Sequence, residues 1–186
     1  MGRLVYAAIA SLDRFIEDAQ GSFEWAAPDT EVHRFVNELE RSVGTYLYGR
    51  RMYETMRFWE SVDPDSDDPL SGDYAAIWQA ADKIVFSTTL AGSTTAKTRL
   101  ERRFDPEMVA RLKEASSHDL TVGGPGLAAE ALRAGLVDEI HLFSVPVLVG
   151  GGKAVFPPDV RFALEQVEAR SFGNGTVYLR YAVRRG

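Results

Sequence analysis

Residues 121–129, with the sequence Thr-Val-Gly-Gly-Pro-Gly-Leu-Ala-Ala, are the most informative stretch about the fold. An apolar strand over residues 120–122 runs into the glycines, and a helix opens after them with Leu127, Ala131 and Leu132 on one face. Glycine lets a backbone approach a ligand closely, and the free N–H groups of a new helix favour an anion. The stretch therefore predicts a strand–turn–helix unit and suggests a nucleotide phosphate as its ligand.

The glycine turn also fits the pattern G-x-G-x-x-A over residues 124–129. Two features separate it from a dinucleotide-binding domain of the Rossmann type. The motif lies late in the chain instead of after the first strand, and no acidic residue ends a parallel strand about 20 residues further on. On this motif alone, a structural turn and a phosphate site are equally good interpretations.

Composition sets the broad class of the protein. The chain has 186 residues, of which 45% are hydrophobic and 26% charged, so we expect one soluble globular domain over residues 1–186. A net charge of −6 disfavours a general nucleic-acid binder. The absence of cysteine excludes disulfides, thiol chemistry and Cys-ligated zinc. Without a membrane-length apolar run or a signal-peptide pattern, we expect a cytoplasmic protein with no membrane partner.

Strand and helix signals alternate along most of the chain, which indicates an α/β domain. The expected strands lie at 3–10, 45–48, 83–87, 120–122 and 139–149, and the expected helices begin at 29–30, 49, 74, 106 and 126. Residues 11–28 and 60–72 are expected to be loops, and Gly44 to end the first helix. The last two segments, 162–172 and 176–184, alternate apolar and polar residues around Gly173-Asn174-Gly175, which predicts an antiparallel hairpin.

A second candidate phosphate site lies at Gly49-Arg50-Arg51, where a short strand ends and a helix begins. Arginine stays charged and offers forked donors to phosphate, and two arginines at a helix N-terminus oppose the helix dipole unless an anion is bound. An anion partner is therefore favoured over a solvated charge pair. Ser87 and Thr88 end another strand, and beside the arginines they would suit a ribose phosphate.

Three further patterns do not predict a phosphate or metal site. The run Val149–Ala154 lacks the first glycine and the magnesium-binding hydroxyl of a P-loop, so it is interpreted as a flexible turn. The three histidines lack metal-ligand spacing, and the acidic loop from Asp63 to Asp68 lacks the glycine and glutamate of a calcium loop. The sequence therefore predicts no metal.

The first long loop carries carboxylates near the end of the first strand, where open α/β sheets bind ligands. Asp13 either supplies a proton or makes a turn, and the sequence supports the two interpretations equally. Asp29 is better explained as the cap of the following helix than as a ligand-binding group.

Taken together, the chain resembles the dihydrofolate reductase-like superfamily from about residue 5 to residue 184. It is most similar to the branch that contains the reductase domain of the riboflavin-biosynthesis bifunctional deaminase-reductase. The resemblance rests on the order and spacing of short anchors at 8–13, 48–54, 85–87, 122–127, 135–140 and 146–153. The deaminase half of that enzyme needs Cys-ligated zinc, so the cysteine-free chain is expected to be a stand-alone reductase domain.

The resemblance implies a three-layer fold with helices on both faces of a mostly parallel sheet of about eight strands, an antiparallel C-terminal hairpin, NADPH as hydride donor and a homodimer. It also implies roles for particular residues. Arg50 and Arg51 would contact the cofactor phosphates, with Ser87 and Thr88 near the adenosine ribose phosphate. The pyrophosphate would be wrapped by Gly123, Gly124, Gly126 and Leu127. Ala10 and Ile16 would lie near the nicotinamide, and Gly49 would also belong to the cofactor site. Asp13, Trp25 and Tyr53 would face the substrate.

Two departures bear on the substrate. Dihydrofolate reductase proper carries an acidic residue on its first helix. When the sequences are aligned at Pro28, that position is Thr30 in this chain, and Asp29 lies one position before it. Where the riboflavin branch commonly has an acid before the glycine pair, this chain has Val122. The expected activity is therefore NADPH-dependent reduction of a pteridine-like or aminopyrimidine-like molecule, similar to 5-amino-6-(5-phosphoribosylamino)uracil reductase, with Asp13 or water as proton donor. The alternatives are dihydrofolate reduction and a non-catalytic nucleotide-binding or regulatory protein.

Overall fold

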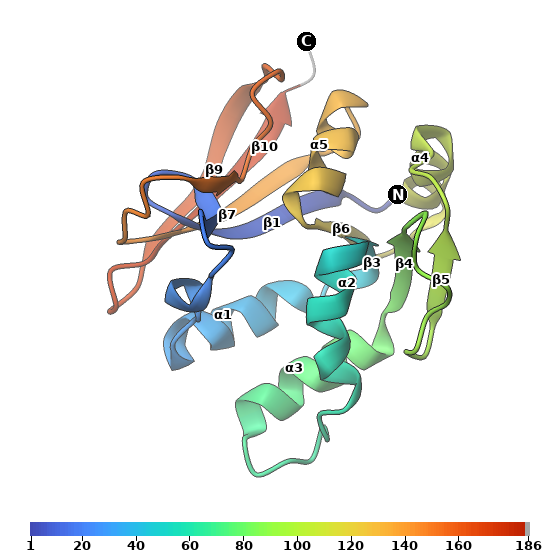
Figure 1. Ribbon diagram of the computed structural model, residues 1–186, viewed down its shortest axis with the longest axis horizontal. Helices are drawn as coiled ribbons and strands as arrows, with labels where there is room; N and C mark the ends of the chain where they lie inside the picture. Colours follow the sequence, from blue (N-terminus) through green and yellow to red (C-terminus); the bar gives the residue numbers. More distant parts are fainter. Residues whose placement is uncertain (185–186) are drawn as a thin grey trace.

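A computed structural model describes residues 1–184 of the chain, and at its centre lies an eight-stranded sheet in the order β5-β4-β3-β6-β1-β7-β10-β9 (Figure 1). The strands are β1 (Leu4–Ser11), β3 (Val43–Gly49), β4 (Asp82–Phe86), β5 (Thr98–Glu101), β6 (Asp119–Gly123), β7 (Glu139–Val145), β9 (Ala163–Ser171) and β10 (Val177–Arg184). The six strands from β5 to β7 are parallel, and β10 runs antiparallel to β7 and β9. The predicted fold class and its C-terminal hairpin are confirmed.

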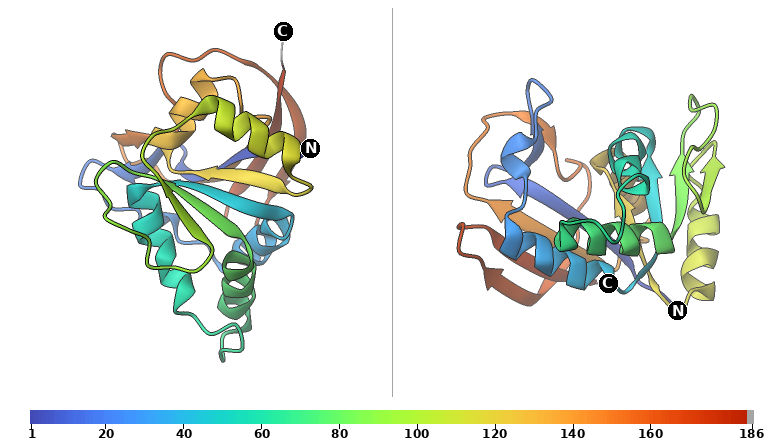
Figure 2. Two further views of the ribbon diagram at one scale, coloured as in Figure 1. Left: turned by 90° about the vertical axis from the view of Figure 1, so that its right-hand side faces the viewer. Right: turned by 90° about the horizontal axis from the view of Figure 1, so that it is seen from below.

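Helices cover both faces of this sheet (Figure 2). They are α1 (Thr30–Glu40), α2 (Arg50–Met56), α3 (Pro69–Ala80), α4 (Pro106–Ala115) and α5 (Pro125–Arg133), with 3-10 turns η1 (Glu24–Ala26) and η2 (Arg57–Glu60). On one face, Phe35 of α1 packs on Tyr178, and Trp78 of α3 packs among Tyr46 and Tyr48. On the other face, α4 and α5 contribute Val109 and Ala131 to the largest apolar cluster. Within residues 1–184 no helix is long and apolar enough to cross a bilayer.

An aspartate caps α1, α3 and α4, and the last two also have a proline in the first turn. Asp29 caps α1 by accepting a hydrogen bond from the backbone N–H of Val32 at 2.9 Å, which confirms the cap interpretation. The expected helix at 106–115 is also confirmed, with Asp105 as cap and Pro106 in its first turn. α3 begins in the same way, with Asp68 as its cap and Pro69 as its first residue. The expectations of a loop to residue 72 and a helix start at 74 were therefore wrong.

Three small elements lie in segments that were predicted to be a loop or a turn. Within the expected loop at 11–28 lie β2 (Phe15–Asp18) and η1, and β2 pairs with β8 (Gly152–Ala154). The run interpreted as a flexible turn therefore ends in a strand. Gly152 has φ +135°, and a Cβ there would clash with the Glu17 carbonyl oxygen. Only glycine permits this close pairing of β8 with β2.

The remaining differences concern strand boundaries. Gly44 does not end the first helix but belongs to β3, where a Cβ would lie 2.8 Å from the Cβ of His118. The expected strand to residue 149 stops at Val145, just before Pro146. The four-residue edge strand β5 was missed, since its short, charged sequence lacks a strong strand signal.

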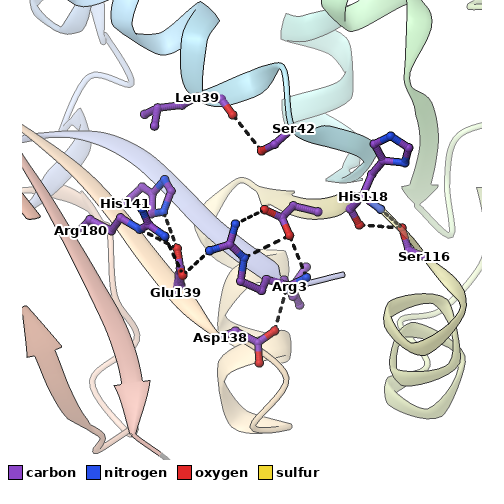
Figure 3. Close-up of polar contacts among 11 residues, drawn as sticks. Arg3, Leu39, Ser42, Ser116, His118, Asp138, Glu139, His141 and Arg180 are labelled. Atoms are coloured by element: carbon purple, nitrogen blue, oxygen red, sulfur yellow. Dashed lines mark hydrogen bonds and ion pairs between the residues drawn. The ribbon is translucent and has the colours of Figure 1, made fainter. Parts of the chain in front are cut away.

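A cluster of charged side chains joins the amino ends of β1, β6 and β7 (Figure 3). This Glu139 cluster comprises Arg3, Asp119, Glu139, His141 and Arg180. The Glu139 carboxylate accepts hydrogen bonds from Arg3 Nη1 at 2.7 Å, Arg180 Nε at 2.8 Å and His141 Nε2 at 3.0 Å. Burial acts to raise the pKa of Glu139, but these hydrogen bonds and arginine charges lower it far below its ordinary value. The cluster therefore ties four strands together through one ionised carboxylate.

Candidate functional site

The carboxyl ends of β3, β4 and β6 bring the predicted phosphate-binding segments together. These strands are adjacent and parallel, with Gly49 beside Phe86 and Tyr48 beside Gly123 in the sheet register. Each strand therefore ends at the same edge, followed by the arginine turn, the Ser87-Thr88 turn and the glycine turn respectively. The three segments, far apart in the sequence, form one candidate site.

The glycines of the turn before α5 serve different purposes. A Cβ at Gly123 would lie 2.8 Å from the Tyr48 ring, and Gly124 has φ +88°, so the fold itself requires glycine at both positions. Gly126 lies in the first turn of α5, and a Cβ there would meet no atom within 4 Å. Neither packing nor backbone conformation accounts for Gly126. It leaves open space beside the free N–H groups of α5, where a ligand can approach the backbone.

An open groove of about 570 Å³ lies beside the arginine turn and the Ser87-Thr88 turn. It is lined by Arg50, Phe86, Ser87, Thr88, Thr89, Arg102, Arg103, Phe104 and Glu130, which we call the arginine groove. The structure thus brings the predicted residues Arg50, Ser87 and Thr88 together in one cavity. Sequence reasoning missed Arg102, Arg103 and Phe104 because it missed β5, which ends just before them. The adjacent arginines Arg102 and Arg103 were the available sequence signal for an anion site. They indicate this site only when β5 is known to pair with β4, because that pairing brings them beside Ser87 and Thr88.

Electrostatics in the arginine groove favour an anion. Arg50 pairs with Glu54 at 2.8 Å and also donates to Thr89 Oγ1 at 2.9 Å. Arg102 donates to the carbonyl oxygens of Ser87 and Leu90, which leaves its charge without a carboxylate partner. Within residues 1–184, no hydrogen bond or ion pair engages the Arg103 side chain. The one carboxylate in the lining, Glu130, already pairs with Arg133.

The remaining lining residues give the groove its shape. Ser87 Oγ accepts hydrogen bonds from the backbone N–H groups of Thr89 and Leu90, so this hydroxyl fixes the turn, while Thr88 is exposed. Phe104 packs against Phe86 with ring centroids 5.4 Å apart. The groove therefore combines hydroxyl groups, three arginines and an aromatic wall. These groups suit a phosphorylated nucleoside.

Arg51 lies apart from the groove lining. Its side chain is 81% exposed, and its nearest carboxylate is Glu17 of β2 at 3.9 Å. Glu17 also lies 4.0 Å from Lys153 of β8, so it bridges α2 and the small sheet. The predicted phosphate contact of Arg51 stays a prediction.

Asp13 anchors the turn before β8. Its carboxylate accepts hydrogen bonds from the backbone N–H groups of Val149 at 3.3 Å and Gly150 at 2.8 Å. A hydrogen bond with Ser11 and these backbone bonds lower the pKa of Asp13, which works against proton donation at neutral pH. The role of Asp13 as proton donor stays a prediction, and the structure adds the turn as its partner.

The other predicted nicotinamide and substrate contacts lie around the end of β1. Ala10 is fully buried in β1, and Ile16 of β2 packs on the edge of the main core. Trp25 is half-buried in η1, where its indole N–H donates to the Ser22 carbonyl oxygen. Their ligand contacts remain predictions.

Tyr53 is 1% exposed and is not placed in an open pocket. Its hydroxyl lies 3.0 Å from Thr95 Oγ1 and accepts from the backbone N–H of Thr94 at 2.9 Å. Burial acts to raise the pKa of Tyr53, but these hydrogen bonds outweigh it and lower the pKa. Tyr53 therefore helps to pack α2 against the loop after β4, and its contact with substrate stays a prediction. Within residues 1–184, no group of His, Asp or Glu side chains is arranged to hold a metal ion.

The parallel sheet with its antiparallel C-terminal hairpin, and the groove at the carboxyl ends of β3 and β4, define an α/β protein with a candidate ligand groove. A family model for the RibD C-terminal domain matches residues 3–178. The chain therefore belongs to the RibD C-terminal domain family, a group with reductases among its structural relatives.

Individual relatives agree with this assignment. The chain is 30% identical to the uncharacterised protein YyaP of Bacillus subtilis strain 168, over 96% of this chain and 94% of that one. A candidate riboflavin biosynthesis protein from Shewanella sp. PV-4 has the same fold, with a TM-score of 0.76, 20% identity and coverage of 98% and 99%.

A further solved structure is that of the deaminase and 5-amino-6-(5-phosphoribosylamino)uracil reductase from Thermotoga maritima. It has a TM-score of 0.68 and 17% identity, and covers 98% of this chain but only 57% of the other. The chain therefore matches a little over half of that protein.

Proposed function

We propose that this protein is an NADPH-dependent reductase of a small heterocycle. The observation that carries the proposal is the arginine groove, in which Arg50, Arg102 and Arg103 line an open space of about 570 Å³ whose lining also includes Glu130 of α5. Three arginines with so little carboxylate compensation suit a doubly charged ribose phosphate better than an unphosphorylated ribose. This favours NADPH over NADH.

Along the carboxyl edge of the sheet, three groups of residues would bind three parts of the cofactor. The arginine groove would hold the adenosine phosphate end, with Phe104 against the adenine. Gly124 and Gly126 would let the pyrophosphate lie on the N–H groups of α5. The ends of β1 and β7, with Asp13, would form the region next to the nicotinamide. When bound, NADPH would supply a hydride to the substrate, and the chain would orient both molecules and exclude water.

For the substrate we propose an aminopyrimidine-like or pteridine-like molecule. Structural relatives named as reductases of such molecules support this class, including a pyrimidine reductase-like protein from Corynebacterium diphtheriae. Dihydrofolate reduction is the first alternative. A nucleotide-binding protein that has the groove but no turnover is the second, and it belongs to a different functional class.

Fluorescence titration with NADPH and NADH, followed by a panel of aminopyrimidines, pteridines and dihydrofolate, tests this proposal. We expect tight NADPH binding and NADPH oxidation with a member of the first two groups. Oxidation with dihydrofolate alone would support the first alternative. Binding without oxidation across the panel would support the second, and failure of NADPH to bind would overturn the proposal.

Gly126→Ala separates ligand binding from folding. Alanine fits the open space and the helical backbone at this position, so we expect the free energy of unfolding to rise by about 0.5–1 kcal/mol. The methyl group would occupy the space left for the pyrophosphate, so NADPH binding should weaken by about tenfold, or about 1.4 kcal/mol.

Thermal denaturation and NADPH titration measure the two effects of Gly126→Ala. The matched control is Glu107→Ala, at the same position of α4 after the cap and the proline. This control should leave NADPH affinity unchanged. Unchanged affinity in Gly126→Ala itself would contradict a pyrophosphate at the start of α5.

Asp13→Asn tests the predicted proton donor. If the Asp13 carboxyl supplies the proton, turnover should be lost across the pH range while NADPH binding survives. If Asp13 acts only by holding Val149 and Gly150, turnover should fall with the shape of the pH profile unchanged. Unaltered turnover would exclude both roles.

A further inference from the structure

Arg14, just after the carboxyl end of β1, has a backbone conformation that favours glycine. Its φ is +72°, and within residues 1–184 the only other non-glycine residue with a positive φ is Lys97. Hydrogen bonds fix this conformation, because the Arg14 N–H donates to the Ser11 carbonyl oxygen and the Arg14 carbonyl oxygen accepts from the N–H of Val155. A side chain in this region strains the backbone, and glycine does not. Glycine would therefore suit the fold better at this position.

The side chains of the two strained residues differ in what they contribute to the fold. Lys97 Nζ donates to the Ala80 carbonyl oxygen at 2.8 Å, so the Lys97 side chain helps to hold its own segment. The Arg14 side chain is exposed, and among residues 1–184 it makes no hydrogen bond or ion pair. Backbone strain of this kind clusters at active sites and ligand sites. The Arg14 side chain is therefore available to a ligand and is not needed by the fold.

The carboxylates closest to Arg14 in the chain do not neutralise it. Asp13 accepts hydrogen bonds from backbone N–H groups of the turn before β8, and Asp18 accepts from backbone N–H groups of its own turn. Glu17 lies within 4.0 Å of two other cationic side chains. The whole chain carries a net charge of −6, which repels anions at long range. A free guanidinium at this edge of the sheet is a local exception that can bind an anion.

β1 places Arg14 beside the region proposed for the nicotinamide. β1 lies between β6 and β7 (Figure 1), so it adjoins the strands whose turns are proposed to hold the cofactor phosphates. The same region carries Leu12 and Leu148, which are 56% and 70% exposed, and the Leu12 N–H donates to the Val147 carbonyl oxygen. A flat ring can cover such apolar side chains, while an acidic substituent pairs with a guanidinium. The region therefore suits a heterocycle that carries a negative charge.

We propose that Arg14 binds an acidic group of the substrate, a phosphate or a carboxylate, so that the protein selects an anionic heterocycle over a neutral one. The inference rests on the proposed function, because it assigns the cofactor phosphates to the turns after β3, β4 and β6. The guanidinium would hold the acidic group through paired hydrogen bonds. A contact between Arg14 and the NADPH pyrophosphate is the competing role, since β1 is next to β6.

Two pairs of compounds test the proposal on the full chain. The first pair is 5-amino-6-(5-phosphoribosylamino)uracil and its dephosphorylated form, and the second is dihydrofolate and a dihydropterin without the glutamate. Calorimetry measures binding of each compound, and NADPH oxidation measures turnover. We expect the anionic member of at least one pair to bind at least about tenfold more tightly than its neutral member. The pair that shows the preference identifies the acidic group as a phosphate or a carboxylate.

Two variants of Arg14 separate its charge from its strain. Arg14→Ala removes the charge and should weaken binding of the preferred anionic compound by about tenfold to a hundredfold, with binding of the neutral compound and of NADPH unchanged. Arg14→Gly also relieves the strain, so it should lose the same preference while its urea unfolding midpoint rises above that of wild type. The matched control is Arg161→Ala, which removes an exposed arginine from the segment before β9 and should keep the preference.

Three results would overturn the proposal. The first is equal affinity of the wild-type protein for both members of each pair, or binding of none of the four compounds. The second is a preference for the anionic compound that survives Arg14→Ala. The third is weaker NADPH binding in Arg14→Ala, which would assign Arg14 to the cofactor. Binding that depends on Arg14 without any NADPH oxidation would support the contact and contradict the proposed reductase.

Discussion

Replacing Glu139 by glutamine is expected to lower the free energy of unfolding by about 2 kcal/mol, because the nearly buried carboxylate loses hydrogen bonds between charged groups. The carboxylate is nearly buried and accepts from Arg3, Arg180 and His141. Glutamine keeps one acceptor oxygen, but its amide group would face arginine donors. The two guanidinium groups would then lie close together with less opposite charge. Urea unfolding at pH 7 measures the loss.

The same carboxylate predicts how stability depends on pH. Its pKa is lowered in the folded protein, so its contribution is present above the ordinary value near 4.5 and is lost as the pH falls below it. Glu139→Gln should therefore differ most from wild type at neutral pH and less under acid conditions. The control Glu165→Gln breaks an exposed pair with Arg184 and should cost less than about 1 kcal/mol. Equal losses in both variants would show that the Glu139 cluster is not a special source of stability.

Arg103→Ala is expected to weaken NADPH binding by about tenfold to a hundredfold, with NADH binding nearly unchanged. The reason is that hydrogen bonds to a charged group contribute about 1.5–3 kcal/mol, and only NADPH carries the extra phosphate. Arg103 lines the arginine groove and has no partner in the described part of the chain, so its removal breaks no internal contact. Fluorescence titration with both nucleotides measures the change in preference.

Arg111→Ala is the matched control for Arg103→Ala. Arg111 lies on α4 with an exposed carboxylate partner, Glu107, and does not line the groove. Its removal should leave the preference for NADPH intact. A parallel loss of NADPH and NADH affinity in Arg103→Ala would place Arg103 at a phosphate that both nucleotides share. No change in either affinity would remove Arg103 from the cofactor site.

The sequence predicted those parts of the fold that local chemistry determines. The α4 boundaries follow from Asp105-Pro106, and the hairpin follows from the alternation on either side of Gly173-Asn174-Gly175. The same cap-and-proline pattern at Asp68-Pro69 was available for α3, but the acidic composition of residues 60–68 obscured it. Propensity and capping are local signals, and they succeed where packing does not override them.

Parts of the site depend on contacts between distant segments, which local patterns do not contain. Arg102, Arg103 and Phe104 join the groove only because β5 pairs with β4. The anchoring of Asp13 by Val149 and Gly150 likewise requires the small sheet of β2 and β8. By contrast, the family resemblance alone predicts that the turns after β3, β4 and β6 belong to one cofactor site.

The sheet order also constrains how the chain is assembled during synthesis. β1 is synthesised before the other strands of the sheet, yet it lies at the centre of the sheet, where Leu4 pairs with Leu120 and Val5 pairs with Glu139. Contacts of such long sequence separation form slowly. A nascent chain that ends before β6 leaves both edges of β1 without their native partners. Such a chain depends on protection from aggregation until most of the protein has been translated.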